Sequence, residues 1–444
     1  MEVIRPYPRD ITTTSVATAS PHVRPEDLAT CVSCGLCLND CPTYRILGDE
    51  ADSPRGRIQL IRWLVQPSEE RVSRDERDLP ASDERPSSGE MLRDAAAHIE
   101  ACLVCRACET ACPSGVPFGR IMEGAREVLH ERRREGRIAG ALRRFGLGIV
   151  ANASRLGLAT RLSDAYARSA IATLVARAGP RALAWTSSLA PRREGAAYTP
   201  VERADADVCL FAGCVMREAF GDTERATVRV LERDGRTVSA PAEQGCCGAL
   251  HAHAGDGATA RELARLNVDA FAGTEAPIVV NAAGCGAHLK AYGEVLAGDA
   301  AWSERASAFA RRVRDASEIA RAAPLATGRP LRVVYQDACH LAHGQRIRTQ
   351  PRALLRAIAG VTLVEIEDAE RCCGSAGIYN ITHPDISAEL QREKVARILA
   401  ARPDVIVSAN PGCMLQLQAG LRSAHSRLPV VHLMRFLDDP AAFA

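Results

Sequence analysis

Eight of the seventeen cysteines occur in two copies of one spacing, and this duplication constrains the fold more than any other feature of the chain. In each copy three cysteines are separated by two residues, and a fourth follows three residues later, directly before a proline. The first copy is Cys31, Cys34, Cys37 and Cys41, and the second is Cys102, Cys105, Cys108 and Cys112. Thiolates placed this closely wrap a loop around a metal centre, so both segments are expected to fold around metal.

This spacing is typical of bacterial two-cluster ferredoxins, in which three cysteines of a run bind one [4Fe–4S] cluster and the fourth binds the other. We therefore predict crossed ligation. Cluster 1 is expected on Cys31, Cys34, Cys37 and Cys112, and cluster 2 on Cys102, Cys105, Cys108 and Cys41. The alternative is a pair of structural zinc sites, because C-x2-C pairs also bind zinc. Zinc sites have a longer gap between the two pairs, so the spacing favours clusters.

Composition excludes several classes of protein. A chain of 444 residues with 47% apolar and 25% charged residues is typical of a globular protein of two to four domains. The formal charge of +2 gives no reason to expect a nucleic-acid partner. No apolar run reaches the roughly 18 residues of a membrane-spanning helix, and no signal peptide is recognisable. Cysteine-rich chains without an export signal hold metal in a reducing compartment, so we expect a cytoplasmic location.

Two N-terminal regions differ in composition. Residues 1–134 hold both cysteine runs, and amphipathic patterns at 56–65 and 90–102 predict helices beside them. We expect an all-helical ferredoxin domain rather than the small β-containing type. Residues 135–201 contain no cysteine and many arginines, which predicts a basic helical linker packed on the cluster domain. The alternative for this linker is docking to a membrane surface or a partner subunit. Lysine occurs only as Lys290 and Lys394, which we interpret as a compositional habit.

The rest of the chain is a tandem duplication, with one repeat at 202–326 and the other at 327–444. Four cysteines of the first repeat return about 126 residues later in the second. They are Cys214, Cys246, Cys247 and Cys285, and then Cys339, Cys372, Cys373 and Cys413. Short apolar strands are expected at 208–212, 237–240 and 278–281, and again at 331–336, 361–366 and 405–409. Helical patterns between them predict two α/β repeats with parallel sheets, so the fold class is α + α/β.

The repeated cysteines are possible ligands of one or two further iron–sulfur clusters. Each Cys-Cys-Gly (CCG) turn is opened by a glycine, so two neighbouring thiols can reach one centre. Nearby histidines could ligate, bond to a sulfide or serve the fold; they are His251, His253, His288, His340 and His343. Cys209 has no counterpart in the second repeat and is expected to be a buried apolar residue. No GxGxxG pattern indicates a nicotinamide site, and we assign no catalytic residue.

Five segments resemble the glycolate oxidase iron–sulfur subunits, a family related to the heterodisulfide reductase catalytic subunits and the anaerobic glycerol-3-phosphate dehydrogenase small subunit. They are residues 31–58, 102–119, 244–256, 335–351 and 371–380. The resemblance implies an electron-transfer subunit of an oxidoreductase complex. Its partners would be FAD-containing glycolate oxidase subunits that convert glycolate to glyoxylate. This chain would pass the electrons toward a quinone or another membrane-side acceptor. Its expected location is the cytoplasm, and the alternative is a peripheral position at the inner face of the membrane.

One departure from the heterodisulfide reductases bears on the chemistry. In those proteins each CCG unit ends in Cys-x-x-Cys and offers five thiolates, whereas here the last positions are His288 and Gln416. Four thiolates suffice for an ordinary cube but not for the five-thiolate site that carries out disulfide chemistry. The alternatives are a relay for D-lactate or glycerol-3-phosphate oxidation, a thiol–disulfide reductase, and a zinc-bound scaffold.

Overall fold

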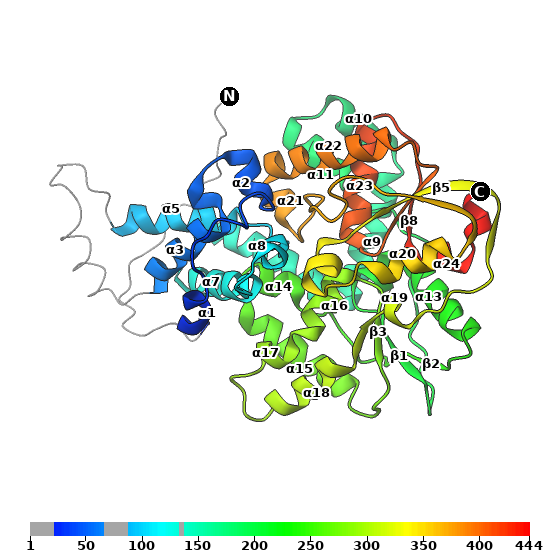
Figure 1. Cartoon of the computed structure of the whole chain (residues 1–444), viewed down its shortest axis with the longest axis horizontal. Coiled ribbons are helices and arrows are strands. Elements are labelled where there is room, and N and C mark those ends of the chain that lie inside the picture. The colour runs from blue at the N-terminus through cyan, green and yellow to red at the C-terminus, as the bar shows by residue number, and fades with distance from the viewer. Residues whose placement is uncertain (1–21, 66–87, 133–136) are drawn as a thin grey trace. The chain divides into compact units, whose positions relative to one another are not determined.

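The computed structural model describes residues 22–65, 88–132 and 137–444 (Figure 1). It divides into two compact units. Unit 1 comprises Met1–Gly146 and Leu250–Gly257, and unit 2 comprises Leu147–Ala249 and Ala258–Ala444. Within the described part of the chain, the helices are all too short or too polar to cross a membrane. The finer division into four domains stays a prediction.

Unit 1 is built from helices in its described residues, as the sequence predicted. Its elements are α1 Pro25–Ala29, α2 Pro42–Leu47, the 3-10 turn η1 Glu50–Asp52, α3 Pro54–Val65, α5 Ser88–Glu100, α6 Ala107–Ala111, α7 Phe118–Arg132 and the first part of α8 Arg137–Ala151. Pro42 occupies the first turn of α2 directly after Cys41, where its missing N–H costs nothing. The apolar faces of α3, α5 and α7 form one core that also contains Cys102 and Cys108. The cysteine loops are therefore anchored on a helical core.

The linker helices of unit 2 are α9 Ala153–Ala167, α10 Ala170–Ala178 and α11 Arg181–Ser188. These helices pack on the two repeats, whereas the sequence predicted packing on the cluster domain. The indole N–H of Trp185 donates to the carbonyl of Asn380 at 2.6 Å, and Arg422 donates to the carbonyl of Ser188 at 2.6 Å. A glycine permits close packing of α9, because a Cβ on Gly157 would lie 2.9 Å from a carboxylate oxygen of Glu218.

Each repeat contains a four-stranded parallel sheet, and the two sheets have equivalent strand orders, β2-β1-β3-β4 and β6-β5-β7-β8. The strands are β1 Val208–Phe211, β2 Val238–Ser239, β3 Ile278–Val280, β4 Val313–Asp315, β5 Ala326–Gln336, β6 Ala359–Val364, β7 Val405–Ser408 and β8 Val430–His432. Six of them were expected from the sequence. The edge strands β4 and β8 were missed; β4 contains two charged residues, Arg314 and Asp315, and β8 has only two apolar residues before His432.

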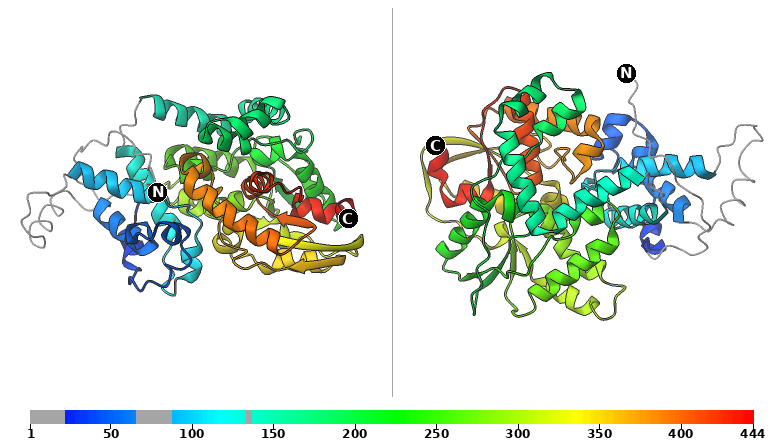
Figure 2. Two further views of the ribbon diagram at one scale, coloured as in Figure 1. Left: turned by 90° about the horizontal axis from the view of Figure 1, so that it is seen from above. Right: turned by 180° about the vertical axis from the view of Figure 1, so that it is seen from behind.

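Helices connect and cover these strands, as a parallel sheet requires. In the first repeat they are α12 Val215–Ala219, α13 Gly221–Arg233, α14 Ala249–His253, α15 Gly257–Ala270, α16 Ala283–Lys290, α17 Tyr292–Val295, α18 Ser303–Arg312 and α19 Ala316–Ile319. In the second they are the π-turn η2 His340–Gly344, α20 Thr349–Arg356, α21 Tyr379–Thr382, α22 Pro384–Ala400, α23 Pro411–Ser423, α24 Leu433–Asp438 and η3 Pro440–Phe443. Figure 2 shows the helices of the second repeat beside its sheet.

The two repeats share a hydrophobic core, to which the central strands of both sheets contribute. Leu210 and Val279 of the first sheet and Val333 and Val405 of the second belong to one contiguous cluster of buried side chains. Central strands of parallel sheets are apolar on both faces, which explains the continuous apolar runs in the sequence. The two repeats are therefore packed together in unit 2 through a common core.

A buried histidine joins the two repeats and makes their stability sensitive to acid. His432 lies at the end of β8, and its Nε2 is 2.7 Å from the carbonyl oxygen of Asn281 in the first repeat. Burial lowers the pKa of His432 to about 4. The unfolded chain therefore binds more protons than the folded chain between pH 6.5 and 4, so stability falls as the pH falls through that window.

We expect the wild-type chain to lose about 2 kcal/mol more unfolding free energy than His432→Asn between pH 7 and pH 5. Urea denaturation of metal-free protein, followed by circular dichroism, measures the difference. Equal acid sensitivity in the two proteins would contradict the assignment of the buried neutral form to His432.

Candidate metal centres

The predicted ligands of cluster 1 surround a single pocket in unit 1. The pocket has an empty volume of about 420 Å³, part of which is open to solvent. Its lining includes Cys31, Cys34, Cys37 and Cys112, together with Cys108 and apolar side chains. Cysteine sulfurs around an apolar hollow are the donor set that an iron–sulfur cluster requires. The residues present therefore fit such a group.

The surroundings of Cys37 show that the two cysteine runs meet in space. The pKa of the Cys37 thiol is raised to about 11, first by burial and then by the nearby charges of Cys31, Cys41 and Cys112. Cys112 is far from Cys37 in the sequence and belongs to the second run. Crossed ligation of cluster 1 requires this approach.

The predicted ligands of cluster 2 also gather around one another. Burial raises the pKa of the Cys108 thiol well above its ordinary value, and the charges of Cys105, Cys102 and Cys41 add to the effect. The charge of Cys41 from the first run therefore acts on a thiol of the second run. The charge of Cys41 acts on thiols of both runs, so the assignment of the fourth cysteines to the two clusters stays a prediction.

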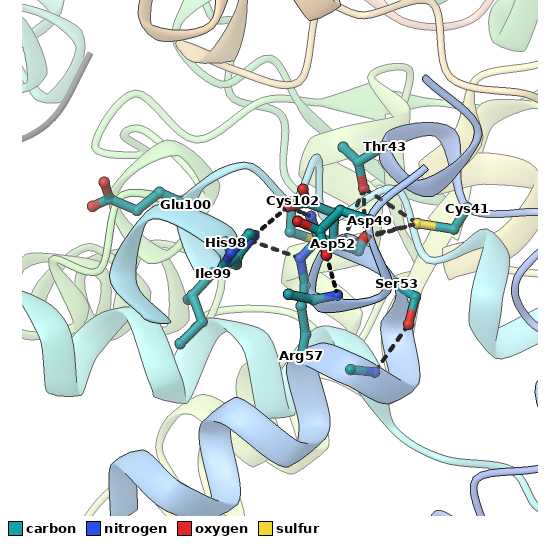
Figure 3. A network of polar contacts seen from close by, with 12 residues as sticks. Cys41, Thr43, Asp49, Asp52, Ser53, Arg57, His98, Ile99, Glu100 and Cys102 are labelled. Atoms are coloured by element: carbon teal, nitrogen blue, oxygen red, sulfur yellow. Dashed lines mark hydrogen bonds and ion pairs between the residues drawn. The ribbon is translucent and has the colours of Figure 1, made fainter. Parts of the chain in front are cut away.

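Cys41 contacts a buried network of polar side chains that the sequence analysis did not identify (Figure 3). Its sulfur lies 3.3 Å from the Oγ1 of Thr43 and 3.8 Å from the Nη1 of Arg57. The guanidinium of Arg57 also donates to Oγ1 of Thr43 at 2.9 Å and to the carbonyl of His98 at 2.7 Å. A carboxylate oxygen of Asp52 accepts from Arg57 at 3.2 Å and lies 2.9 Å from Nδ1 of His98.

The four cysteines of the first repeat meet at the carboxyl end of its sheet. The sulfurs of Cys247 and Cys285 are 3.2 Å apart. The pKa of the Cys214 thiol is well above its ordinary value, first because of a hydrogen bond with Cys246 and then because of burial, with the charge of Cys285 adding to it. A hydrogen bond with Cys246 is also the largest cause of the raised pKa of Cys247. All four predicted thiols are therefore mutual neighbours.

The second repeat gathers its four cysteines in the same way. Hydrogen bonds with Cys339 and Cys373 and burial raise the pKa of Cys372 well above its ordinary value. The pKa of Cys413 is raised in turn, mainly by a hydrogen bond with Cys373. Cys373 differs from the others, because hydrogen bonds from Cys372 and Cys413 lower its pKa, and the cation of Lys394 adds to that effect. Each repeat therefore offers four converging thiols.

The two four-cysteine sites lie next to each other across the shared core of the repeats. Asn410 links them, because its side-chain oxygen accepts from the backbone N–H of Gly284 at 3.2 Å while its amide donates to the sulfur of Cys413 at 3.5 Å. Gly284 directly precedes Cys285 of the first site. A second contact is the backbone bond from Ala283 N–H to the carbonyl of Ala409, at 3.1 Å.

The candidate histidines take up different positions. One ring nitrogen of His251 lies 3.1 Å from Asp256, and one of His253 lies 3.0 Å from Glu123. His288 is buried, and its Nε2 lies 3.4 Å from where a Cβ of Gly248 would stand. His340 and His343 belong to η2, where Nδ1 of His343 lies 3.2 Å from Arg348. His288 is thus the histidine placed beside a CCG turn.

Two buried basic residues near cysteines were not predicted from the sequence. Arg57 is one of many arginines, so nothing in the sequence distinguishes it. Lys394 did carry a signal, because it is one of only two lysines in the chain. Lys394 is only 1% exposed, a structural position that the rarity of lysine alone did not reveal.

Two domain families match the chain. A 4Fe-4S dicluster domain matches residues 27–116, and a cysteine-rich domain named CCG matches residues 208–290 and 333–418. The first match covers both ferredoxin-type cysteine runs, and it confirms two [4Fe–4S] clusters as the cofactors of this region. The second match confirms the tandem repeat.

Curated relatives match over most of the chain. The probable glycolate oxidase iron–sulfur subunit of Bacillus subtilis (strain 168) is 34% identical over 94% of this chain and 94% of its own length. The glycolate oxidase iron–sulfur subunit of Escherichia coli (strain K12) is 32% identical over 89% of this chain and 91% of its own length. Lactate utilization protein A of Oceanobacillus iheyensis is 29% identical over 52% of this chain and 96% of its own length. The chain belongs to the family of glycolate oxidase iron–sulfur subunits.

Proposed function

We propose that this chain is the electron-transfer subunit of a glycolate oxidase complex. The observation that carries the proposal is the meeting of the two cysteine runs, because Cys31, Cys34 and Cys37 of the first run line one pocket with Cys108 and Cys112 of the second. In crossed ligation each run would supply a ligand to both centres, which would keep the two centres at a fixed separation. Such a pair accepts and passes electrons over a fixed distance.

The residues that would hold the iron–sulfur groups are the crossed sets in unit 1 and the four-cysteine sets in unit 2. Cluster 1 is assigned to Cys31, Cys34, Cys37 and Cys112, and cluster 2 to Cys102, Cys105, Cys108 and Cys41. Further clusters are assigned to Cys214, Cys246, Cys247 and Cys285, and to Cys339, Cys372, Cys373 and Cys413. The convergence of four thiols in each repeat supports the second assignment.

When bound, these groups supply one-electron redox chemistry, with potentials set by charge, burial and hydrogen bonds to sulfur. The protein contributes those three influences. Backbone N–H groups of Val104 and Gly248 point to the sulfurs of Cys102 and Cys246, at 3.3 and 3.5 Å. The side-chain amide of Asn410 donates to the sulfur of Cys413. Oxidation of the hydroxy acid is assigned to a partner flavin subunit, because flavins accept the electron pair that such a reaction releases.

The electron acceptor is assigned to a quinone or another membrane-side group, with the chain on the cytoplasmic face. The linker helices support this position. Leu158, Leu162, Ile171 and Leu174 are more than half exposed, and Arg155 and Arg161 are exposed beside them. Exposed apolar side chains interspersed with arginine fit an anionic membrane surface.

We expect anaerobically reconstituted protein to contain at least about eight irons per chain and no flavin. Iron and zinc analysis of the full-length protein tests this. Stoichiometric zinc with trace iron would contradict the proposal.

The substrate is tested by deleting the chain from the cell and comparing glycolate-dependent with D-lactate-dependent quinone reduction. Loss of the glycolate activity alone supports glycolate as the substrate of the partner.

Cys37→Ser is expected to remove cluster 1 and to reduce quinone reduction by the complex by at least about tenfold, because cluster 1 then has only three thiolate ligands. Cys209→Ser is the matched control, since Cys209 is a buried cysteine in β1 outside all four ligand sets. The control should keep both its iron and its activity. Full activity of Cys37→Ser with quinone would place cluster 1 outside the path of the electrons.

A further inference from the structure

The two CCG turns are packed against equivalent helices that differ in charge. In the first repeat, a Cβ on Gly248 would lie 3.2 Å from the carbonyl oxygen of Ala260 in α15. In the second, a Cβ on Gly374 would lie 2.6 Å from the carbonyl oxygen of Ser387 in α22. Both glycines have a φ of +88°, which favours glycine. The same turn therefore rests on the same point of its helix in both repeats.

This correspondence pairs Lys394 with Asn267. Lys394 follows Ser387 by seven residues, and Asn267 follows Ala260 by seven residues. Two helical turns separate the members of each pair, so both side chains lie on the face that meets the CCG turn. The second repeat thus has a lysine at the place where the first has a neutral amide.

Asn267 and Lys394 perform the same structural task with different charges. The amide of Asn267 donates to the carbonyl of Cys246 at 2.9 Å, and its oxygen accepts from the N–H of Gly245 at 2.9 Å. The ammonium of Lys394 donates to the carbonyls of Asp368 and Ala369, at 2.6 and 3.0 Å, just before the cysteine pair. Both side chains are at most 1% exposed.

The other charges near Lys394 compensate one another. Arg371 and Arg397 lie 2.7 and 3.3 Å from the carboxylate of Asp368, and each lies 3.9 Å from Glu393. Lys394 is the remaining basic group on this side of the site; its pKa is lowered, first by burial, while the charges of Cys373 and Cys372 act to raise it. In the first repeat the titratable residue beside the CCG turn is His288, whose Nε2 lies 3.4 Å from where a Cβ of Gly248 would stand. Its counterpart in the second repeat is Gln416, which is neutral.

We infer that Lys394 gives the second four-cysteine site a higher reduction potential than the first, so that electrons collect on the second repeat. This inference rests on the proposed function, because it requires redox centres in both repeats. A positive charge held close to thiolates stabilises the reduced, more negative state of the centre that they bind. Lys394 thus acts on the centre through its charge and does not bind it. The contact through Asn410 connects the two sites, and Lys394 would set the direction of electron transfer between them.

The test is a redox titration of the anaerobically reconstituted full chain at pH 8, monitored by electron paramagnetic resonance. The signal of the second site is identified as the one that Cys373→Ser removes. Lys394→Asn copies the first repeat and should lower the ratio of reduced to oxidised centre at least tenfold at a given potential, which is 59 mV for a one-electron couple. Lys394→Met, a neutral side chain of similar length, provides the same comparison if the asparagine variant does not fold.

Lys290→Asn is the matched control, because it removes the only other lysine, whose ammonium lies 3.0 Å from Glu318. Its titration should match that of the wild type. Iron bound at the second site with an unchanged potential in both Lys394 variants would overturn the inference and leave the proposed function intact. Iron content that is unaffected by Cys373→Ser would overturn both the inference and the assignment of a cluster to this repeat.

Discussion

Cys41→Ser is expected to abolish the [4Fe–4S] cluster of the second cysteine run while sparing the cluster of the first run, to which Cys41 belongs in sequence. Cys41 is 7% exposed, and its charge acts on the Cys108 thiol. Its loss leaves that cluster with three thiolates, whereas Cys31, Cys34, Cys37 and Cys112 are untouched. Iron analysis should show a loss of about four irons per chain.

Double variants distinguish crossed from local ligation. Cys41→Ser combined with Cys108→Ser should lose no more iron than either change alone, because both residues serve one cluster. Cys41→Ser combined with Cys37→Ser should lose the iron of both clusters. Cys112→Ser provides the reciprocal test and should behave as Cys37→Ser does. If Cys41→Ser and Cys37→Ser instead removed the same iron, each run would bind its own cluster, and the central observation of the proposed function would be lost.

Arg57→Met is expected to lower the unfolding free energy of metal-free protein by about 3–5 kcal/mol, the cost of leaving one partner of a buried ion pair alone. Arg57 is 0% exposed and Asp52 is 1% exposed. The guanidinium also donates to Thr43 and to the backbone carbonyls of Asp52 and His98. Methionine fills much of the same volume but satisfies none of these acceptors. Urea denaturation followed by circular dichroism measures the loss.

Arg120→Met is the control for this prediction. Arg120 follows the same local pattern, since Pro-Arg-Gly-Arg-Ile in α3 corresponds to Pro-Phe-Gly-Arg-Ile around the start of α7. It pairs with Asp27 at 2.6 Å, but its side chain is 30% exposed, so a smaller loss of about 1 kcal/mol is expected. Arg57→Met with Asp52→Asn should recover part of the stability, because the second change removes the uncompensated carboxylate. Equal losses for Arg57→Met and Arg120→Met would show that burial does not determine the effect.

The helical first unit, the duplicated parallel sheets and the cofactors were predictable because each depends on local or periodic patterns. Cysteine spacing is a local constraint on a loop, so both runs could be recognised without a structure. The central strands β1, β3, β5 and β7 are apolar on both faces and stand out in the sequence. The short edge strands β4 and β8 and the packing of α9–α11 on the repeats were not predictable. They depend on contacts between residues far apart in the chain.

The sequence by itself predicted which side chains would bind metal, and it determined that the C-terminal half is built twice. Only the tertiary structure showed that the two copies differ in charge beside the CCG turn. Lys394 and Asn267 occupy corresponding positions because α22 and α15 contact the two CCG turns at equivalent points. The rarity of lysine in the chain could be interpreted only once Lys394 was seen to be buried. The physical reason is that the effect of a charge on a metal centre depends on its distance from that centre and on its exposure to water. The residues next to it in the sequence specify neither quantity.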